Sequence, residues 1–184
     1  AAEKVRIDSS GKVGIGTTAP SYKLALKDNS ASAYPLSLES GTIGTAGNHT
    51  GIRFGFTGNT YQKGAIIYEA ANDGGYGRGK FMFALEGTAD ASNADETDAK
   101  MTIDYSGNVG IGTTSPTEPL TVSKTASGST TQIASFVNPV GTASTGVKVW
   151  LSGTNTTTRG TFIEAVAEST SNDHTLRFGT SAAS

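Results

Sequence analysis

Short segments in which apolar and polar residues alternate recur along this chain, separated by stretches rich in glycine, asparagine and serine. Alternation with a period of two is typical of half-buried strands, and the intervening clusters are typical of turns. The pattern therefore predicts an all-β fold. The expected strands are 5–7, 13–15, 22–26, 36–38, 51–56, 64–69, 81–85, 101–103, 109–111, 119–122, 133–136, 146–151, 159–164 and 176–178.

The strands of the central part have large apolar residues at every second position. The segment 51–56 is expected to form a hairpin with 64–69, and 81–85 is expected to follow as a further strand. In 51–56 we expect the large apolar side chains to share one face, and in 81–85 we expect them to point toward the core. These residues are Ile52, Phe54, Phe56, Phe81, Phe83 and Leu85.

One motif appears twice, as VRIDSSGKVGIGTTAP at 5–20 and as MTIDYSGNVGIGTTSP at 101–116. Eleven of the sixteen positions are identical at a constant offset of 96 residues. The chain is therefore a tandem array, and we call this motif the joint. The predicted organisation is joint 1 (1–26), β module 1 (27–100), joint 2 (101–122) and β module 2 (123–184), which repeats module 1 in degenerate form.

Each joint has a short strand followed by a turn, at Asp8–Gly11 or Asp104–Gly107. Aspartate can bond its own backbone two residues on and glycine accepts a positive φ, so a β-hairpin is expected. Glycine weakens the returning strand, which implies that another backbone comes close. Because an isolated hairpin is at best marginally stable in water, we expect a parallel homotrimer. The expected contacts between chains are Gly14, Ile15, Gly16, Gly110, Ile111 and Gly112.

The signature Gly-(Asn/Lys)-Val-Gly-Ile-Gly-Thr-Thr-x-Pro of the two joints resembles a repeat of bacteriophage tail-fibre and receptor-binding proteins. The resemblance implies an elongated homotrimer in which short shaft joints alternate with small antiparallel β modules. It also implies an extracellular virion protein that works with other fibre or tail proteins and attaches to a host-cell glycan or protein receptor. Such fibres often end in a self-cleaving chaperone domain. Nothing here resembles that domain, so we expect a fragment or a trimmed product.

Composition agrees with a β fold that has small cores. Leu, Ile, Val and Phe total 34 of 184 residues, whereas Gly, Ser and Thr total 71. Burial between chains would complete such cores. With a net charge of −2 and only 14 Lys and Arg, we expect no nucleic-acid binding. The chain has no cysteine and no apolar run long enough to span a bilayer, so we expect neither disulfides nor membrane insertion.

The acidic loop Asp90–Asp98 carries oxygen ligands at alternating positions, as a calcium loop does. It lacks the glycine at position six and the glutamate at position twelve, so a solvated loop is favoured. His49 and His174 lie in unrelated contexts and are interpreted as surface residues. We therefore expect no metal and no cofactor.

Two glutamates, Glu69 and Glu164, recur in the two modules beside the cations Lys63 and Arg159. Paired carboxylates hydrolyse glycosides when they are about 5–9.5 Å apart. Repetition in both modules nevertheless favours a structural role, namely a cross-strand ion pair. No catalytic residue is predicted, and the protein is not expected to be an enzyme.

Exposed aromatic residues are better candidates for binding a partner. Tyr61, Tyr76 and Trp150 fall in turns or opposite the core register, and Arg78 lies close to Tyr76 in the sequence. Aromatic faces beside Arg and Asn commonly hold sugars. For Trp150, packing between strands or between chains is favoured; for Tyr76 both interpretations stay open.

Hypotheses from different functional classes follow. A structural and adhesive virion fibre needs only the repeats that are present, and it is the function we expect. A polysaccharide-depolymerising fibre would need a carboxylate pair in a groove. A bacterial surface adhesin built from the same repeat is a third alternative.

Overall fold

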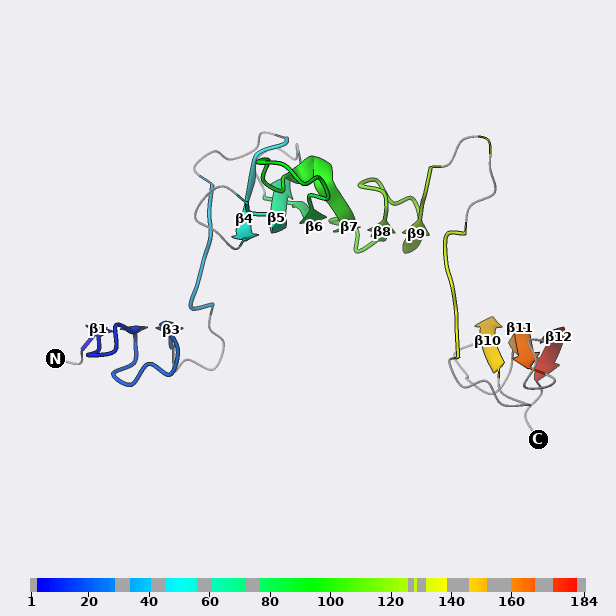
Figure 1. Ribbon diagram of the computed structural model, residues 1–184, viewed down its shortest axis with the longest axis horizontal. Helices are drawn as coiled ribbons and strands as arrows, with labels where there is room; N and C mark the ends of the chain where they lie inside the picture. Colours follow the sequence, from blue (N-terminus) through cyan, green and yellow to red (C-terminus); the bar gives the residue numbers. More distant parts are fainter. Residues whose placement is uncertain are drawn as a thin grey trace. The chain divides into compact units, whose positions relative to one another are not determined.

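The computed structural model describes residues 3–28, 34–40, 46–55, 61–71, 77–125, 128, 132–138, 146–151, 160–167 and 174–181. These residues form twelve strands and one short 3₁₀ helix, so the predicted all-β class is confirmed (Figure 1). The chain divides into two compact units, Ala1–Ser123 and Lys124–Ser184. The first unit contains two sheets and the second contains one.

The first sheet is joint 1, with strands β1 (Val5–Ile7), β2 (Val13–Ile15) and β3 (Leu24–Leu26). β1 and β2 pair antiparallel, as the hairpin prediction requires. β3 lies within the strand predicted at 22–26, and it pairs in parallel with β2. The joint is therefore a three-stranded unit, because the loop after β2 brings the chain back along the free edge of that strand (Figure 1).

The turn of the joint is formed by its aspartate, as predicted. The Asp8 carboxylate accepts hydrogen bonds from the backbone N–H groups of Ser10, at 2.8 Å, and Lys12, at 2.9 Å. Gly11 donates its N–H to the Asp8 carbonyl and has a φ of +70°. The second joint repeats this pattern at Asp104, at distances of 2.8 and 2.9 Å. The repeated sequence therefore folds by the same local contacts in both places.

The second sheet of the first unit has six strands in the order β4 to β9. Its strands are antiparallel except for β8 and β9, which pair in parallel. Joint 2 thus continues the sheet of module 1, since β7 pairs with β6. The strands are β4 (His49–Phe54), β5 (Gly64–Ala70), β6 (Gly79–Leu85), β7 (Ala99–Ile103), β8 (Val109–Ile111) and β9 (Leu120–Val122).

The core of this sheet lies on the face opposite to the one expected. Its buried residues are three alanines, one isoleucine and one methionine: Ala65, Ile67, Met82, Ala84 and Ala94. The large residues assigned to the core are instead exposed, by 50% at Phe81, 41% at Phe83 and 59% at Leu85. The sequence-based prediction of this face is therefore wrong.

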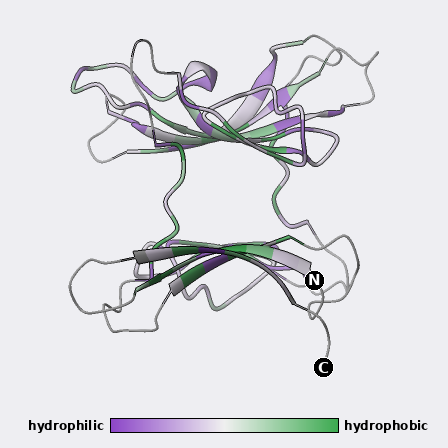
Figure 2. Cartoon of the chain, turned by 90° about the vertical axis from the view of Figure 1, so that its right-hand side faces the viewer, coloured by the Kyte–Doolittle hydropathy of each residue, from purple (hydrophilic) through white to green (hydrophobic). Residues whose placement is uncertain are grey.

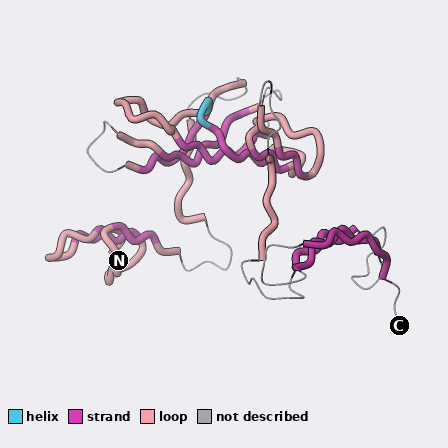
Figure 3. The backbone as a smooth tube through the Cα atoms, turned by 45° about the vertical axis from the view of Figure 1, so that its right-hand side comes forward, coloured by secondary structure: helices cyan, strands magenta, loops and turns pink. Residues whose placement is uncertain are grey.

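The reason lies in the segment between β6 and β7, which covers the other face. Its 3₁₀ helix η1 (Glu96–Asp98) lies against β6, and Figure 3 shows it over one side of the strands. Ala94 donates its N–H to the Gln62 carbonyl at 2.8 Å, and Gln62 donates its own to Asn93 at 2.9 Å. The small side chains of Ala65 and Ala84 on this face leave room for the backbone of the covering segment, which packs against them.

The second unit is a three-stranded antiparallel sheet of β10 (Gly146–Leu151), β11 (Gly160–Ala167) and β12 (His174–Ser181). Strands were predicted at these three places, whereas the interpretation of this unit as a degenerate repeat of module 1 stays a prediction. The strands expected at 36–38 and 133–136 are not formed. The chain is irregular over 34–40 and 132–138. Their apolar residues are exposed and pair with no neighbouring strand.

Candidate functional site

Among the residues that the structure describes, the most extensive candidate for a functional surface is the exposed apolar face of the six-stranded sheet. Neighbouring strands place Ile52 opposite Ile66, Ile66 opposite Phe83, Phe83 opposite Met101 and Met101 opposite Ile111. Directly paired residues share a face of a sheet, so these side chains form a continuous row. We define the apolar face as Ile52, Phe54, Ile66, Phe81, Phe83, Leu85, Met101 and Ile111.

The sheet of the second unit repeats this division into two faces. One face carries the row Val149, Ile163 and Phe178, and Phe178 is 73% exposed. On the other face, Lys148 forms an ion pair with Glu164 at 3.0 Å and lies 4.1 Å from the centre of the Phe162 ring. Figure 2 shows the hydropathy of the strands in both units. Each unit therefore presents one apolar sheet face that its described residues leave exposed.

The joint glycines are explained by contacts within one chain. A Cβ at Gly14 would lie 2.5 Å from the Thr17 carbonyl oxygen, and one at Gly110 would lie 2.5 Å from that of Thr113. A Cβ at Gly112, whose φ is +72°, would overlap the carbonyl oxygen of Ser123. The backbone that was predicted to lie close to these glycines is present, but it belongs to the same chain. These glycines therefore no longer argue for a neighbouring chain at this place.

Gly16 repeats the geometry of Gly112, with a φ of +73° and the Lys27 carbonyl where a Cβ would stand. The two isoleucines at the same position of the repeated motif, Ile15 and Ile111, are exposed on their sheets. Their role as contacts between chains stays a prediction. Ile111 belongs to the apolar face defined above.

The structure describes the side chains of two of the four predicted binding residues, Tyr61 and Arg78. Tyr61 is exposed just before β5. Tyr76 lies outside the described residues, and so does the side chain of Trp150, whose backbone pairs with Phe162. Arg78 lies over the ring of Tyr105, with its guanidinium carbon 5.0 Å from the ring centre.

Tyr105 is a residue that the sequence prediction missed. It lies in the turn of joint 2, and it is 60% exposed. Together with Asp104 it lines a cavity of about 360 Å³ at the ends of β5 and β6. A signal existed in the sequence, because the two joints differ at this position: Ser9 in the first copy corresponds to Tyr105 in the second.

The two repeated glutamates form cross-strand ion pairs, as predicted, but with other partners. Glu69 pairs with Lys80 at 3.0 Å, and Glu164 pairs with Lys148 at 3.0 Å. Lys63 instead pairs with Asp90, and Arg159 lies outside the described residues. Both glutamates therefore have a structural partner on a neighbouring strand.

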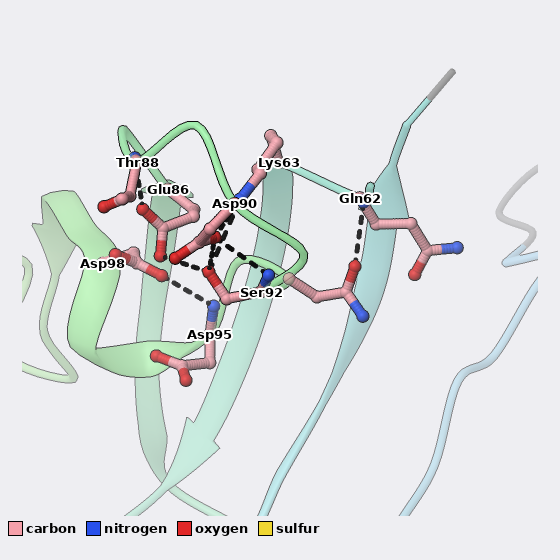
Figure 4. Close-up of polar contacts among 9 residues, drawn as sticks. Gln62, Lys63, Glu86, Thr88, Asp90, Ser92, Asp95 and Asp98 are labelled. Carbon is pink, nitrogen blue, oxygen red and sulfur yellow. Dashed lines mark hydrogen bonds and ion pairs between the residues drawn. The ribbon is translucent and has the colours of Figure 1, made fainter. Parts of the chain in front are cut away.

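The acidic loop is tied to the sheet by a polar cluster (Figure 4). Lys63 donates to the Asp90 carboxylate at 2.8 Å, and Ser92 bonds both Asp90 and Glu86. The hydrogen bond from Lys63 and those from Ser92 lower the pKa of Asp90 well below its usual range. Within the part of the chain that the structure describes, no group of three or more His, Cys, Asp or Glu side chains could hold a metal ion.

No protein-family model matches the chain, and no curated protein matches it significantly. Among the residues with described positions, no helix combines the length and the apolar character needed to cross a membrane.

Proposed function

We propose that this chain is a segment of a structural and adhesive fibre, built as a parallel homotrimer and carried on a phage virion for attachment to host cells. The observation that carries the proposal is the apolar face of the first unit. Isolated soluble proteins rarely expose contiguous apolar patches of more than a few hundred Å². A face with Phe54, Phe81 and Phe83 all exposed is typical of a surface that another chain covers.

The energetics favour association through these faces. Burying the exposed half of one large apolar side chain contributes about 1 kcal/mol. Several such side chains lie on the apolar face of each chain, and more lie on the sheet of the second unit. Association in a parallel arrangement would cover equivalent faces of all copies at once, because both units carry the same pattern. The resemblance of the joints to phage tail-fibre repeats supplies the remaining parts of the proposal: three chains, a location on the virion and a receptor on the host cell.

The repeated joint supports a structural role for the chain. Both copies fold by the same hydrogen bonds, and in the second copy the sheet of the preceding module continues into the joint. Strands that continue from module 1 into joint 2 hold this joint to its module more firmly than a flexible linker would. The partners in this proposal are two further copies of the chain, other fibre or tail proteins, and a host-cell glycan or protein.

The test is the molar mass of the full chain in solution by light scattering, with small-angle scattering on the same sample. We expect the mass of three chains and a rod-like profile. Phe83→Asp and Phe178→Asp should each lower the mass, because a buried charge is costly in an apolar interface. Tyr34→Asp is the matched control, since Tyr34 is 94% exposed and lies outside the sheets. A compact wild-type particle with the mass of one chain would refute the proposal.

A further inference from the structure

A cavity at the end of the six-stranded sheet has the size and chemistry of a small-molecule site. It lies where β5 and β6 meet joint 2, and its volume of about 360 Å³ falls in the range of ligand pockets. Its lining combines an aromatic ring, ionised groups, hydroxyl groups and alanine methyl groups. We define the edge cavity by the residues Glu69, Lys80, Asp104, Tyr105, Thr114 and Ser115.

The polar groups of the edge cavity are held in place by other contacts. Glu69 and Lys80 form their ion pair at 3.0 Å, and the side chains are only 17% and 27% exposed. Asp104 accepts hydrogen bonds from Ser106 and Asn108, so its carboxylate is fixed by the turn. A carboxylate can accept about four hydrogen bonds, and both acids therefore keep acceptor capacity for a ligand. The site is organised before a ligand arrives.

Tyr105 supplies an apolar surface at the rim. Its ring lies between the edge cavity and a second depression of about 390 Å³, which Tyr68 and Phe81 also line. The guanidinium of Arg78 stacks on the ring at 5.0 Å from its centre. Such a cation–π contact orients the ring. An oriented aromatic ring beside fixed hydrogen-bonding groups suits a ligand that has one apolar face and a hydroxylated edge.

The edge cavity contains residues that both joints share and residues that occur only in the second joint. Asp104, Thr114 and Pro116 have identical counterparts in the first copy, whereas Tyr105 and Ser115 replace Ser9 and Ala19. The first joint makes the same turn with serine and alanine at these positions. The fold of the joint therefore requires neither the aromatic ring nor the added hydroxyl group of the edge cavity.

We propose that the edge cavity binds a neutral pyranose unit of a glycan. The ring of Tyr105 stacks on the C–H face of the sugar, and the carboxylates of Glu69 and Asp104 accept hydrogen bonds from its hydroxyl groups. Lys80 donates to a sugar oxygen. A neutral sugar is preferred to an acidic one, because two carboxylates face a single ammonium group in the cavity. This inference rests on the proposed adhesive function and names the ligand class.

The experiment is saturation-transfer NMR on the full chain. The probes are the methyl α-pyranosides of glucose, galactose and mannose, with N-acetylneuraminic acid as the acidic comparison. We expect transfer to at least one neutral probe. The double variant Tyr105→Ser, Ser115→Ala, which reproduces the first joint, should weaken binding at least about tenfold through loss of the stacked ring. Tyr105→Phe keeps the ring and should retain binding.

Three results would overturn the inference: no transfer to any neutral probe, equal transfer to the double variant, or binding of the acidic probe alone. Far-ultraviolet circular dichroism and thermal melting of each variant establish that it is folded. Light scattering on the same samples separates this inference from the fibre proposal. A three-chain mass without sugar binding refutes only the edge cavity, whereas sugar binding by a single-chain particle refutes only the homotrimer.

Discussion

Replacement of Gly112 by alanine tests the physical account of the joint most directly. Gly112 has a φ of +72°, and an added Cβ would overlap the carbonyl oxygen of Ser123. That carbonyl belongs to the residue whose N–H donates to Ile111 at 2.9 Å, at the end of the parallel pair β8 and β9. Alanine therefore strains its own backbone and pushes β9 away from β8.

The size of the effect can be worked out from these two terms. A non-glycine residue in the left-handed region costs about 1–2 kcal/mol. Loss of the Ser123 hydrogen bond costs about 1 kcal/mol more. We expect Gly112→Ala to lower the free energy of unfolding by about 2–3 kcal/mol in total. Gly107→Ala should lower it by only about 1–2 kcal/mol, because Gly107 has a φ of +84° but nothing within 4 Å of its Cβ position.

The assay is urea unfolding of the full chain, followed by hydrogen exchange at the backbone amides of the joint. Gly87→Ala serves as the neutral reference, because its Cβ position is open and its φ is not in the left-handed region. Amides of β8 and β9 should exchange faster in Gly112→Ala than in Gly107→Ala. Equal losses in these two variants would refute the argument that the close carbonyl, rather than φ alone, requires glycine.

Three further predictions concern the sheet of the first unit. Met82→Ala should cost about 2–5 kcal/mol in urea unfolding, because Met82 is fully buried; a loss below that of an exposed-site variant would contradict the assigned core face. Thr102→Val should raise stability by about 1 kcal/mol, since the buried Thr102 hydroxyl has no hydrogen-bond partner; destabilisation would show that the hydroxyl is paired in solution. The lowered pKa of Asp90 means that the folded chain binds fewer protons than the unfolded chain below about pH 3.9. The ionised Asp90 carboxylate therefore contributes its full stabilisation of the folded chain above that pH, and this contribution is lost as pH falls toward the folded pKa. Asp90→Asn should abolish this part of the pH dependence of unfolding. An unchanged profile would contradict the Lys63 contact.

The sequence by itself determined the turn of the joint. This turn and the role of Asp8 and Asp104 follow from residues within five positions of one another, and local hydrogen bonds decide such elements. The need for a close backbone at the glycines was also predictable, because a strand without side chains must be matched by something near it. The alternation of the longer strands correctly indicated an all-β chain.

Only the tertiary structure decided which face of the sheet is the core and what lines the edge cavity. Alternation places Phe81 and Met82 on opposite faces but does not say which face is covered. The segment between β6 and β7 covers the face that carries Met82, and Ala94 of this segment donates its N–H to the Gln62 carbonyl. The parallel pairing of β3 with β2 and of β9 with β8 likewise depends on the path of the loop that precedes each of these last strands. Tyr105 lines the same cavity as Glu69 and Lys80 only because β6 pairs with both β5 and β7. Contacts between residues far apart in the sequence set these features, and no local pattern encodes them.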